Sequence, residues 1–365
     1  MIWRPRRVAQ AAVAIAVAAC AATAGGTRAG GATSAPPPTL AQMVGQRLVV
    51  GMSGTRADAS LLDRIRRGKI AGVILFSNNI ASPSQLAALT ASIRAAAAAG
   101  GQPRPIIATD QEGGLVKRIP WAPPNLSAQG LGRLPSGRSL DSGAATGRAL
   151  RKAGVNVDLA PVADVPAGPS DFIAQQKRAF SISRFTTSLD VKAFAQGLET
   201  PGVWPTLKHF PGLGRATVSA DVALVKITAS KQNLVKHVLP YQVAIRAGLH
   251  PIVMLSTAVY PAFDWRAAAW SPPIIHNLLR GRLGFAGATM TDSLDSAAAV
   301  RHESISDVAL KGAKAGADLL LVTGSEAESQ GVYKQLLAAA RSGKLPAAGL
   351  TASYNRILTL KSRLN

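Results

Sequence analysis

Cysteine is almost absent from this chain, because Cys20 is the only one among its 365 residues. A single thiol cannot close an intramolecular disulfide, so the fold must rely on its packed core. Acidic residues are also scarce, with 19 Asp and Glu against 41 Lys and Arg. Hydrophobic residues make up 47% and charged residues 16% of the chain, which excludes wholesale disorder and allows a sizeable core.

Several motifs with a defined chemistry are missing too. The sequence has no Gly-x-Ser-x-Gly elbow, no phosphate-binding loop and no dinucleotide fingerprint. Its five histidines are scattered without the spacing of zinc ligands, so we expect neither a metal nor a cofactor. The basic residues form no run interleaved with aromatics, so nucleic acid is not the expected partner of the net charge of +22. Anionic lipid or an anionic cell-wall polymer fits that charge better.

The first residues have the layout of a secretory signal. Three arginines precede an apolar run over residues 8–19, which is too short for a comfortable membrane span. The run ends in Val-Ala-Ala-Cys at Cys20, which resembles a bacterial lipoprotein processing site whose cysteine becomes the lipidated first residue. We expect residues 1–20 to be the signal peptide and residues 21–38, rich in Ala, Gly, Thr and Pro, to be a flexible linker. The protein is predicted to be exported, either anchored in the cell membrane by Cys20 and facing the cell wall, or secreted with an incidental cysteine.

Short apolar runs alternate with helical stretches from residue 39 onward. The runs are apolar almost throughout, which is typical of strands buried on both faces. Helical stretches such as residues 84–99 and 304–315 separate them. The sequence therefore predicts an α/β fold, a TIM-like (β/α)8 barrel in a single catalytic domain over residues 39–365. A doubly wound open sheet is the alternative, although no glycine fingerprint follows the first strand. The eight predicted strands span residues 47–52, 72–76, 105–110, 155–161, 204–210, 251–257, 287–292 and 318–323.

Polar side chains stand where several of these strands end. Asp110 ends the third strand, Lys208 and His209 end the fifth, Ser256 the sixth and Asp292 the seventh. The C-terminal ends of barrel strands form one rim, which is where such barrels carry their chemistry. Carboxylates that face one polar pocket without a metal-ligand cluster suggest chemistry on sugars.

Ordered segments of the chain resemble glycoside hydrolase family 3, and most of all its single-domain β-N-acetylglucosaminidase branch. The resemblance covers nearly everything from residue 40 to the end and implies a TIM-like barrel. It also implies a monomer acting on a carbohydrate, with no cofactor. The matching segments are residues 44–46, 72–77, 110–114, 157–164, 178–180, 208–212 and 278–292.

The resemblance assigns roles to particular residues. It implies that Asp292 is the nucleophile of a retaining, two-step hydrolysis that removes terminal β-N-acetylglucosamine from peptidoglycan-derived sugars. Arg178 matches the arginine of an Arg-Ser-Phe element of the family. The positions that hold sugar hydroxyls in the family correspond to Asp110, Arg118, Lys208 and His209.

One loop departs from the family pattern. In the acetylglucosaminidase branch, an Asp-Ser-His triplet on the loop after the Pro-Gly turn supplies the proton donor. Here Leu213 replaces the usual histidine of the turn, and residues 215–223 contain no histidine. Asp221 is the only acid in that stretch and is our candidate for the general acid and base. The alternatives are a catalytically impaired member that binds cell-wall sugars, or a β-glycosidase with another sugar preference.

Overall fold

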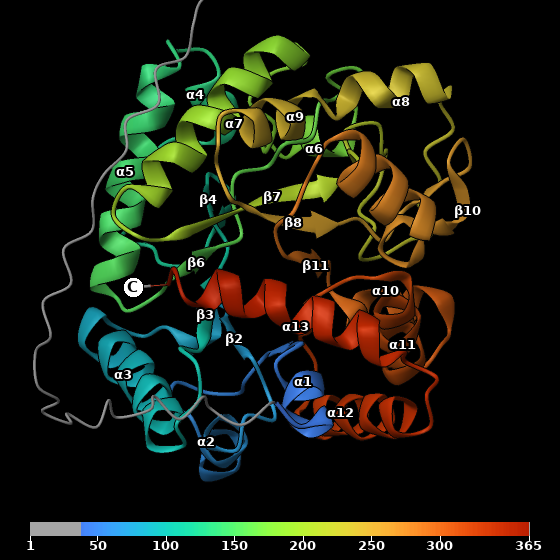
Figure 1. Ribbon diagram of the computed structural model, residues 1–365. Helices are drawn as coiled ribbons and strands as arrows, with labels where there is room; N and C mark the ends of the chain where they lie inside the picture. Colours follow the sequence, from blue (N-terminus) through green and yellow to red (C-terminus); the bar gives the residue numbers. More distant parts are fainter. Residues whose placement is uncertain (1–37, 365) are drawn as a thin grey trace, which may run out of the picture. The chain divides into compact units, whose positions relative to one another are not determined.

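The computed structural model describes residues 38–364, and eight parallel strands form the centre of the fold in this part (Figure 1). Neighbouring strands pair in the order β11-β8-β7-β6-β3-β2-β1-β12. A bridge between Met290 and Leu319 joins β11 to β12, so the strand order nearly closes on itself. The bounds are β1 (Leu48–Val50), β2 (Gly72–Leu75), β3 (Ile106–Thr109), β6 (Val157–Asp158), β7 (Trp204–Phe210), β8 (Ile252–Leu255), β11 (Thr289–Thr291) and β12 (Leu320–Val322).

This arrangement confirms the predicted TIM-like barrel and excludes an open sheet. Each of the eight strands lies inside its predicted range, and most are shorter than predicted. Two antiparallel hairpins that the sequence analysis did not predict, β4–β5 and β9–β10, follow β3 and β8. They comprise β4 (Gln111–Gly113), β5 (Val116–Lys117), β9 (Val259–Tyr260) and β10 (Asp264–Ala267). The signal peptide, Cys20 and residues 21–37 of the predicted linker lie outside the described residues.

Helices connect the strands, and the two helical stretches predicted from the sequence are confirmed as α3 and α11. Many helices begin at a Ser or Asp whose side chain accepts a hydrogen bond from the first turn, as Ser82 does from Gln85 and Ser304 from Asp307. The helices are α1 (Leu40–Gly45), α2 (Ala59–Arg66), α3 (Pro83–Ala99), α4 (Ala128–Leu131), α5 (Gly137–Lys152), α6 (Phe172–Gln175), α7 (Arg184–Glu199), α8 (Lys231–His237), α9 (Leu239–Arg246), α10 (Leu294–Arg301), α11 (Ile305–Ala315), α12 (Glu326–Arg341) and α13 (Ala347–Lys361). Short 3-10 turns η1 (Ser77–Asn79) and η2 (Ala268–Trp270) and the π-helix η3 (Pro273–Arg282) complete the set.

The strands bury both of their faces, which explains their continuous apolar runs. In β2, Ile74 joins the cluster that fills the barrel interior, whereas Val73 and Leu75 join the larger cluster beneath the helices. In β12, Leu321 joins the interior cluster and Leu320 the cluster beneath the helices. This alternation follows from the two-residue period of a strand and fixes which strand residues can face the site.

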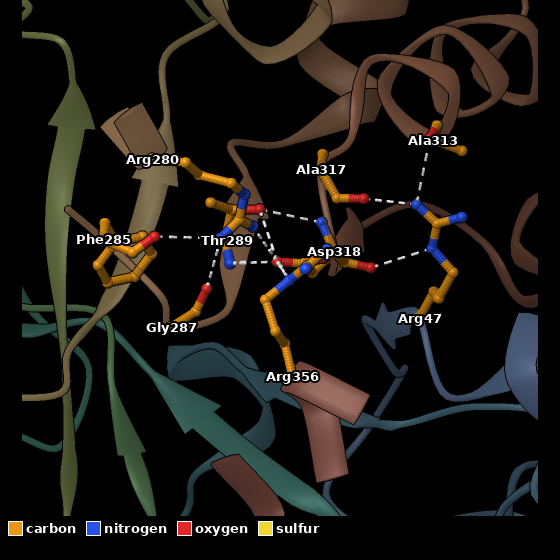
Figure 2. Close-up of polar contacts among 9 residues, drawn as sticks. All are labelled: Arg47, Arg280, Phe285, Gly287, Thr289, Ala313, Ala317, Asp318 and Arg356. Atoms are coloured by element: carbon orange, nitrogen blue, oxygen red, sulfur yellow. Dashed lines mark hydrogen bonds and ion pairs between the residues drawn. The ribbon is translucent and has the colours of Figure 1, made fainter. Parts of the chain in front are cut away.

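Helix α13 closes the N-terminal end of the barrel. Its residues Ile357 and Leu360 belong to the interior cluster. Figure 2 shows the buried Asp318, just before β12, accepting hydrogen bonds from Arg280 and from Arg356 of α13. Asp318 is thus a structural partner of two arginines at this end of the barrel. Because α13 fills this end, a ligand can reach the barrel interior only from the opposite rim.

No helix within residues 38–364 is both long and apolar enough to span a lipid bilayer.

Candidate active site

A polar cavity of about 390 Å³ opens at the C-terminal ends of the strands. Its floor is the top of the barrel interior, where Ile74, Leu159 and Met254 are exposed to the cavity. The structure thus brings every residue that the sequence analysis proposed for the site to one cavity. These residues are Asp110, Arg118, Arg178, Lys208, His209, Asp221 and Asp292.

The β4–β5 hairpin places Arg118 beside Asp110. Asp110 follows the last residue of β3, and the hairpin turns the chain back so that the Arg118 amide donates to the Asp110 carbonyl over 3.2 Å. The turn contains Gly113 and Gly114, both with positive φ, a conformation that other residues rarely adopt. As a result, Arg118 Nη2 lies 3.6 Å from Asp110 Oδ2.

Lys208 links two carboxylates beneath the cavity. Its Nζ lies 2.7 Å from Asp110 Oδ1 and 2.7 Å from Glu112 Oε1, and only 3% of its side chain is exposed. Burial lowers the pKa of Lys208, but the two carboxylates outweigh burial and raise it above its usual value. Lys208 therefore stays protonated and fixed as a hydrogen-bond donor.

Glu112 is also held by Arg178, which approaches it from the segment after α6. Arg178 Nε and Nη2 donate to the two carboxylate oxygens of Glu112, each over 2.8 Å, in the forked geometry of a guanidinium–carboxylate pair. Burial raises the pKa of Glu112, but Arg178 and Lys208 overcome this and hold it at about 2. The ionised Glu112 thus fixes both cations at the cavity wall.

A buried carboxylate orients His209. Asp164, which is fully buried, accepts the main-chain N–H groups of His209 and Leu213 at Oδ1, over 3.1 and 2.6 Å. Its Oδ2 lies 2.7 Å from His209 Nδ1. An ionised carboxylate can only accept, so Nδ1 carries the proton and Nε2 is the nitrogen left for a ligand in the cavity.

Asp292 follows β11 at the edge of the cavity. The main-chain N–H of Ser293 donates to its Oδ1 over 2.8 Å. Burial raises the pKa of Asp292, His209 and Lys208 act to lower it, and the charge of Asp221 raises it further. The sequence pattern placed His209, Lys208 and Asp292 at one rim, and all three line the same cavity.

Asp221 comes to the cavity on the loop between β7 and α8. Its main-chain N–H donates to Ser219 Oγ over 3.1 Å, and this hydroxyl lies 3.2 Å from Asp221 Oδ2. The loop passes close to Val165, where a side chain at Gly214 would lie 2.1 Å from the Val165 carbonyl oxygen. Asp221 is exposed, whereas Asp292, which lines the same cavity, is half-buried.

One further carboxylate lies below these groups. Asp158 at the end of β6 is fully buried, and burial raises its pKa to about 8. The Gln111 N–H donates to Oδ1 over 3.0 Å, while Oδ2 has no partner among the described residues. Asp158 is therefore protonated at neutral pH and adds no charge to the site.

The sequence analysis did not assign Glu112 or Asp164, although both lie in segments that it matched to the family. Glu112 follows Asp110 by two residues, and Asp164 ends the segment 157–164. A charged residue inside an otherwise apolar or glycine-rich stretch was the available signal. Their partners, Arg178 and His209, lie 66 and 45 residues away in the chain, so only the fold reveals the pairing.

The described residues contain no cluster of three or more His, Cys, Asp or Glu side chains placed to hold a metal ion. The carboxylates around the cavity instead stand singly, and each already accepts from a cation or from another hydrogen-bond donor. Such an arrangement is suited to an uncharged ligand with many hydroxyl groups.

Comparison with known proteins identifies the class. The sequence profile described as "Glycosyl hydrolase family 3 N terminal domain" matches residues 39–360, so the chain belongs to glycosyl hydrolase family 3. It is a β-hexosaminidase-like member of that family. A β-hexosaminidase of Stenotrophomonas maltophilia is 31% identical over 296 residues, which cover 78% of this chain and 86% of that protein. A protein of Arthroderma benhamiae named "Uncharacterized secreted glycosyl hydrolase" is 33% identical over 334 residues, 89% of this chain and 94% of its own length.

Solved structures agree with this assignment. The β-N-acetylhexosaminidase from Beutenbergia cavernae superposes with a TM-score of 0.82 at 32% identity, covering 89% of this chain and 99% of that one. A family 3 β-N-acetylglucosaminidase from a Paenibacillus species gives a TM-score of 0.84 at 29% identity over 90% of this chain. This chain spans 63% of the length of the Paenibacillus enzyme.

Proposed function

We propose that this protein is a retaining hydrolase that removes terminal β-N-acetylglucosamine from cell-wall glycans, with Asp292 as its nucleophile. The observation that carries the proposal is the placement of two unlike carboxylates on one cavity. Asp292 is half-buried at a strand end, whereas Asp221 is on an exposed loop close enough to change the pKa of Asp292. The β-hexosaminidase relatives support the choice of sugar.

The first step forms a glycosyl-enzyme. The Asp292 carboxylate attacks the anomeric carbon while the bond from that carbon to the leaving oxygen breaks, and Asp221 donates its proton to that oxygen. In the second step the Asp221 carboxylate takes a proton from water. The resulting oxygen nucleophile displaces Asp292, which leaves as a carboxylate, and the sugar keeps its original configuration.

The remaining residues hold the sugar during both steps. Asp110 accepts from sugar hydroxyls, because Lys208 and Arg118 occupy only part of its capacity as an acceptor. Arg178 and Lys208 donate from positions that Glu112 fixes. His209 offers Nε2 in an orientation fixed by Asp164. Side chains that are already held by hydrogen bonds and ion pairs before the sugar binds lose little conformational entropy on binding.

The location and substrate source follow from the first residues of the chain. The apolar run before Cys20 supports export, and Cys20 would anchor the protein in the membrane beside the cell wall. Peptidoglycan-derived fragments with a terminal N-acetylglucosamine are then the substrates within reach. A relative named as secreted is consistent with export.

A catalytically impaired protein that binds cell-wall sugar is the second candidate. It is favoured by the loop after β7, which has no histidine within residues 215–223, and by the exposure of Asp221. A solvated carboxylate gives up its proton below neutral pH and is then a poor general acid. The sugar-binding groups would remain intact in such a protein.

Turnover by the full-length protein distinguishes these functions. The substrates are 4-nitrophenyl N-acetyl-β-glucosaminide and the N-acetylglucosamine–anhydromuramic acid disaccharide, with Asp292→Asn as the inactive variant. Asp141→Asn, which alters an exposed carboxylate on α5, is the matched control. We expect the wild type and the control to cleave both substrates and Asp292→Asn to bind without cleaving. Binding without cleavage by the wild type would establish the impaired protein, and preference for an aryl glucoside would establish another sugar specificity.

A further inference from the structure

A second cavity, of about 260 Å³, lies at the N-terminal end of the barrel, opposite the sugar site. It is bounded by the segment before β1, by η3, by the end of α11 and by the beginning of α13. No acidic residue is among its lining side chains in the described part of the chain. Its basic lining residues, apart from His276, are Arg47, Arg280, Lys314 and Arg356.

Within residues 38–364, only Arg280 and Arg356 of these four cations pair with a carboxylate, and both pair with Asp318. Asp318 itself does not line the cavity. Asp318 already accepts from Arg280, from Arg356 and from the main chain and hydroxyl of Thr289 (Figure 2). The three buried or half-buried arginines less Asp318 leave an excess of +2 beside the cavity, and the exposed Lys314 adds a further positive charge. Such an excess in a partly buried place is unfavourable unless an anion balances it.

Several hydrogen-bond donors at the cavity are also unused. Arg47 is 98% buried (2% exposed), and its Nε and Nη2 donate to the carbonyls of Asp318, Ala313 and Ala317. Its Nη1 has no partner among the described residues and projects away from Asp318 in Figure 2. Burial lowers the pKa of Arg47 to about 10, the cost expected for a guanidinium without a carboxylate of its own.

Two further buried groups of this cavity have no hydrogen-bond partner within residues 38–364. They are Arg280 Nε and the hydroxyl of Ser353, a residue of α13 that is 3% exposed. Six other unpaired buried atoms lie elsewhere among the described residues. Buried polar atoms are nearly always paired in folded proteins, so two of them beside Arg47 at one cavity favour a ligand there.

The N-terminus of α13 also contributes positive potential to the cavity. The helix has 15 residues, starts after Pro346, and has no side chain that accepts from its first turn. Gly349 of this turn lines the cavity. The free N–H groups of a helix N-terminus favour an anion, and here they meet the arginines of the wall.

We propose that this cavity binds a phosphate group, either as inorganic phosphate or as a phosphomonoester. A dianion balances most of the excess charge. Its oxygens accept from Arg47 Nη1, from the Ser353 hydroxyl, from Arg356, from Lys314 and from the first turn of α13. The bound anion ties α13 to α11 and thereby reinforces the closed N-terminal end of the barrel. The proposal is independent of the sugar chemistry at the other rim.

Calorimetric titration and thermal unfolding of the full-length protein with sodium phosphate test this site. We expect saturable binding and a rise in the melting temperature that chloride at equal ionic strength does not produce. Lys314→Gln should weaken phosphate binding by about two- to fivefold, the effect of one partly exposed ion pair. Lys334→Gln removes an exposed charge from α12, away from the cavity, and should leave the affinity unchanged.

Ser353→Ala distinguishes an effect on phosphate binding from an effect on the stability of the protein without phosphate. Without phosphate it should unfold at the same or a higher temperature than the wild type, because it removes a buried hydroxyl without a partner. With phosphate its gain in melting temperature should be smaller. Glycerol 3-phosphate then distinguishes the two sources, since tighter binding than inorganic phosphate indicates a phosphomonoester. No saturable binding, or equal affinity in Lys314→Gln, Ser353→Ala and Lys334→Gln, would overturn the proposal.

Discussion

In the proposed mechanism, Asp221 is the protonated acid and Asp292 the ionised nucleophile of a retaining hydrolysis. The nucleophile must be ionised when the acid is protonated, and two nearby carboxylates resist losing both protons. Burial favours the protonated form of Asp292, whereas His209 and Lys208 favour its ionised form. The ionisation of Asp292 should therefore limit activity on the acid side.

Removal of the charge on Asp221 should change both the pH dependence and the rate of hydrolysis. In Asp221→Asn the pKa of Asp292 falls, so the acid limb of kcat/KM moves to lower pH. The loss of the general acid should slow a natural disaccharide by about 10²–10⁴-fold and an activated aryl glycoside much less. The pH profiles of both substrates measure this. An unshifted acid limb together with equal losses on the two substrates would remove Asp221 from the mechanism.

Glu112 should make the stability of the barrel depend on pH. Its pKa falls from 4.5 to about 2 on folding, so its contribution is fully present above pH 4.5 and is lost as the pH falls toward 2. The difference corresponds to about 3 kcal/mol as an order of magnitude. Glu112→Gln should lose stability of that order at pH 7 and should show a flatter pH dependence below pH 4.5.

Urea unfolding between pH 2 and 7 tests this prediction. Glu303→Gln is a suitable control, because it removes a half-buried glutamate that pairs with the exposed Lys311. Parallel pH curves for Glu112→Gln and the wild type would contradict the assigned linkage.

At the scale of elements, the sequence predicted the strands and the ends that carry polar residues. Both faces of the eight barrel strands are buried, so most of these strands are short apolar runs, and Asp110 and Asp292 stand out where such runs stop. The pairing of Glu112 with Arg178 was not predictable, because it joins residues from different connections. The closure of the barrel by α13 was equally hidden, since its Ile357 and Leu360 show which cluster they enter only after folding.

The attachment of α13 gives a prediction for this element. Arg356→Ala should lower the free energy of unfolding by about 1–3 kcal/mol, because Asp318 loses one of two guanidinium partners in a buried place. Arg363→Ala removes an exposed arginine just beyond α13 and should change stability by less than about 0.5 kcal/mol. Chemical denaturation measures both, and equal effects would show that the Asp318 contacts do not hold the helix.

At the scale of the whole molecule, the net charge of +22 should draw the protein to anionic cell-wall material. We expect adsorption to an anionic wall polymer at low salt that falls steeply as sodium chloride approaches 0.5 M, because salt screens charges beyond a few ångström. Chitin, which is uncharged, serves as the control. Adsorption that is insensitive to salt, or equal on both polymers, would show that charge does not determine the partner.

In the proposed mechanism, Asp292 forms a covalent bond with the sugar. The direct measurement is incubation of the full-length protein with 5-fluoro-N-acetyl-β-glucosaminyl fluoride, followed by mass spectrometry of the intact chain and of its peptides. We predict a mass increase of one fluorinated N-acetylglucosaminyl unit, located on Asp292 and absent from Asp292→Asn. A label on another residue, or turnover of the reagent with inversion and no label, would contradict this account.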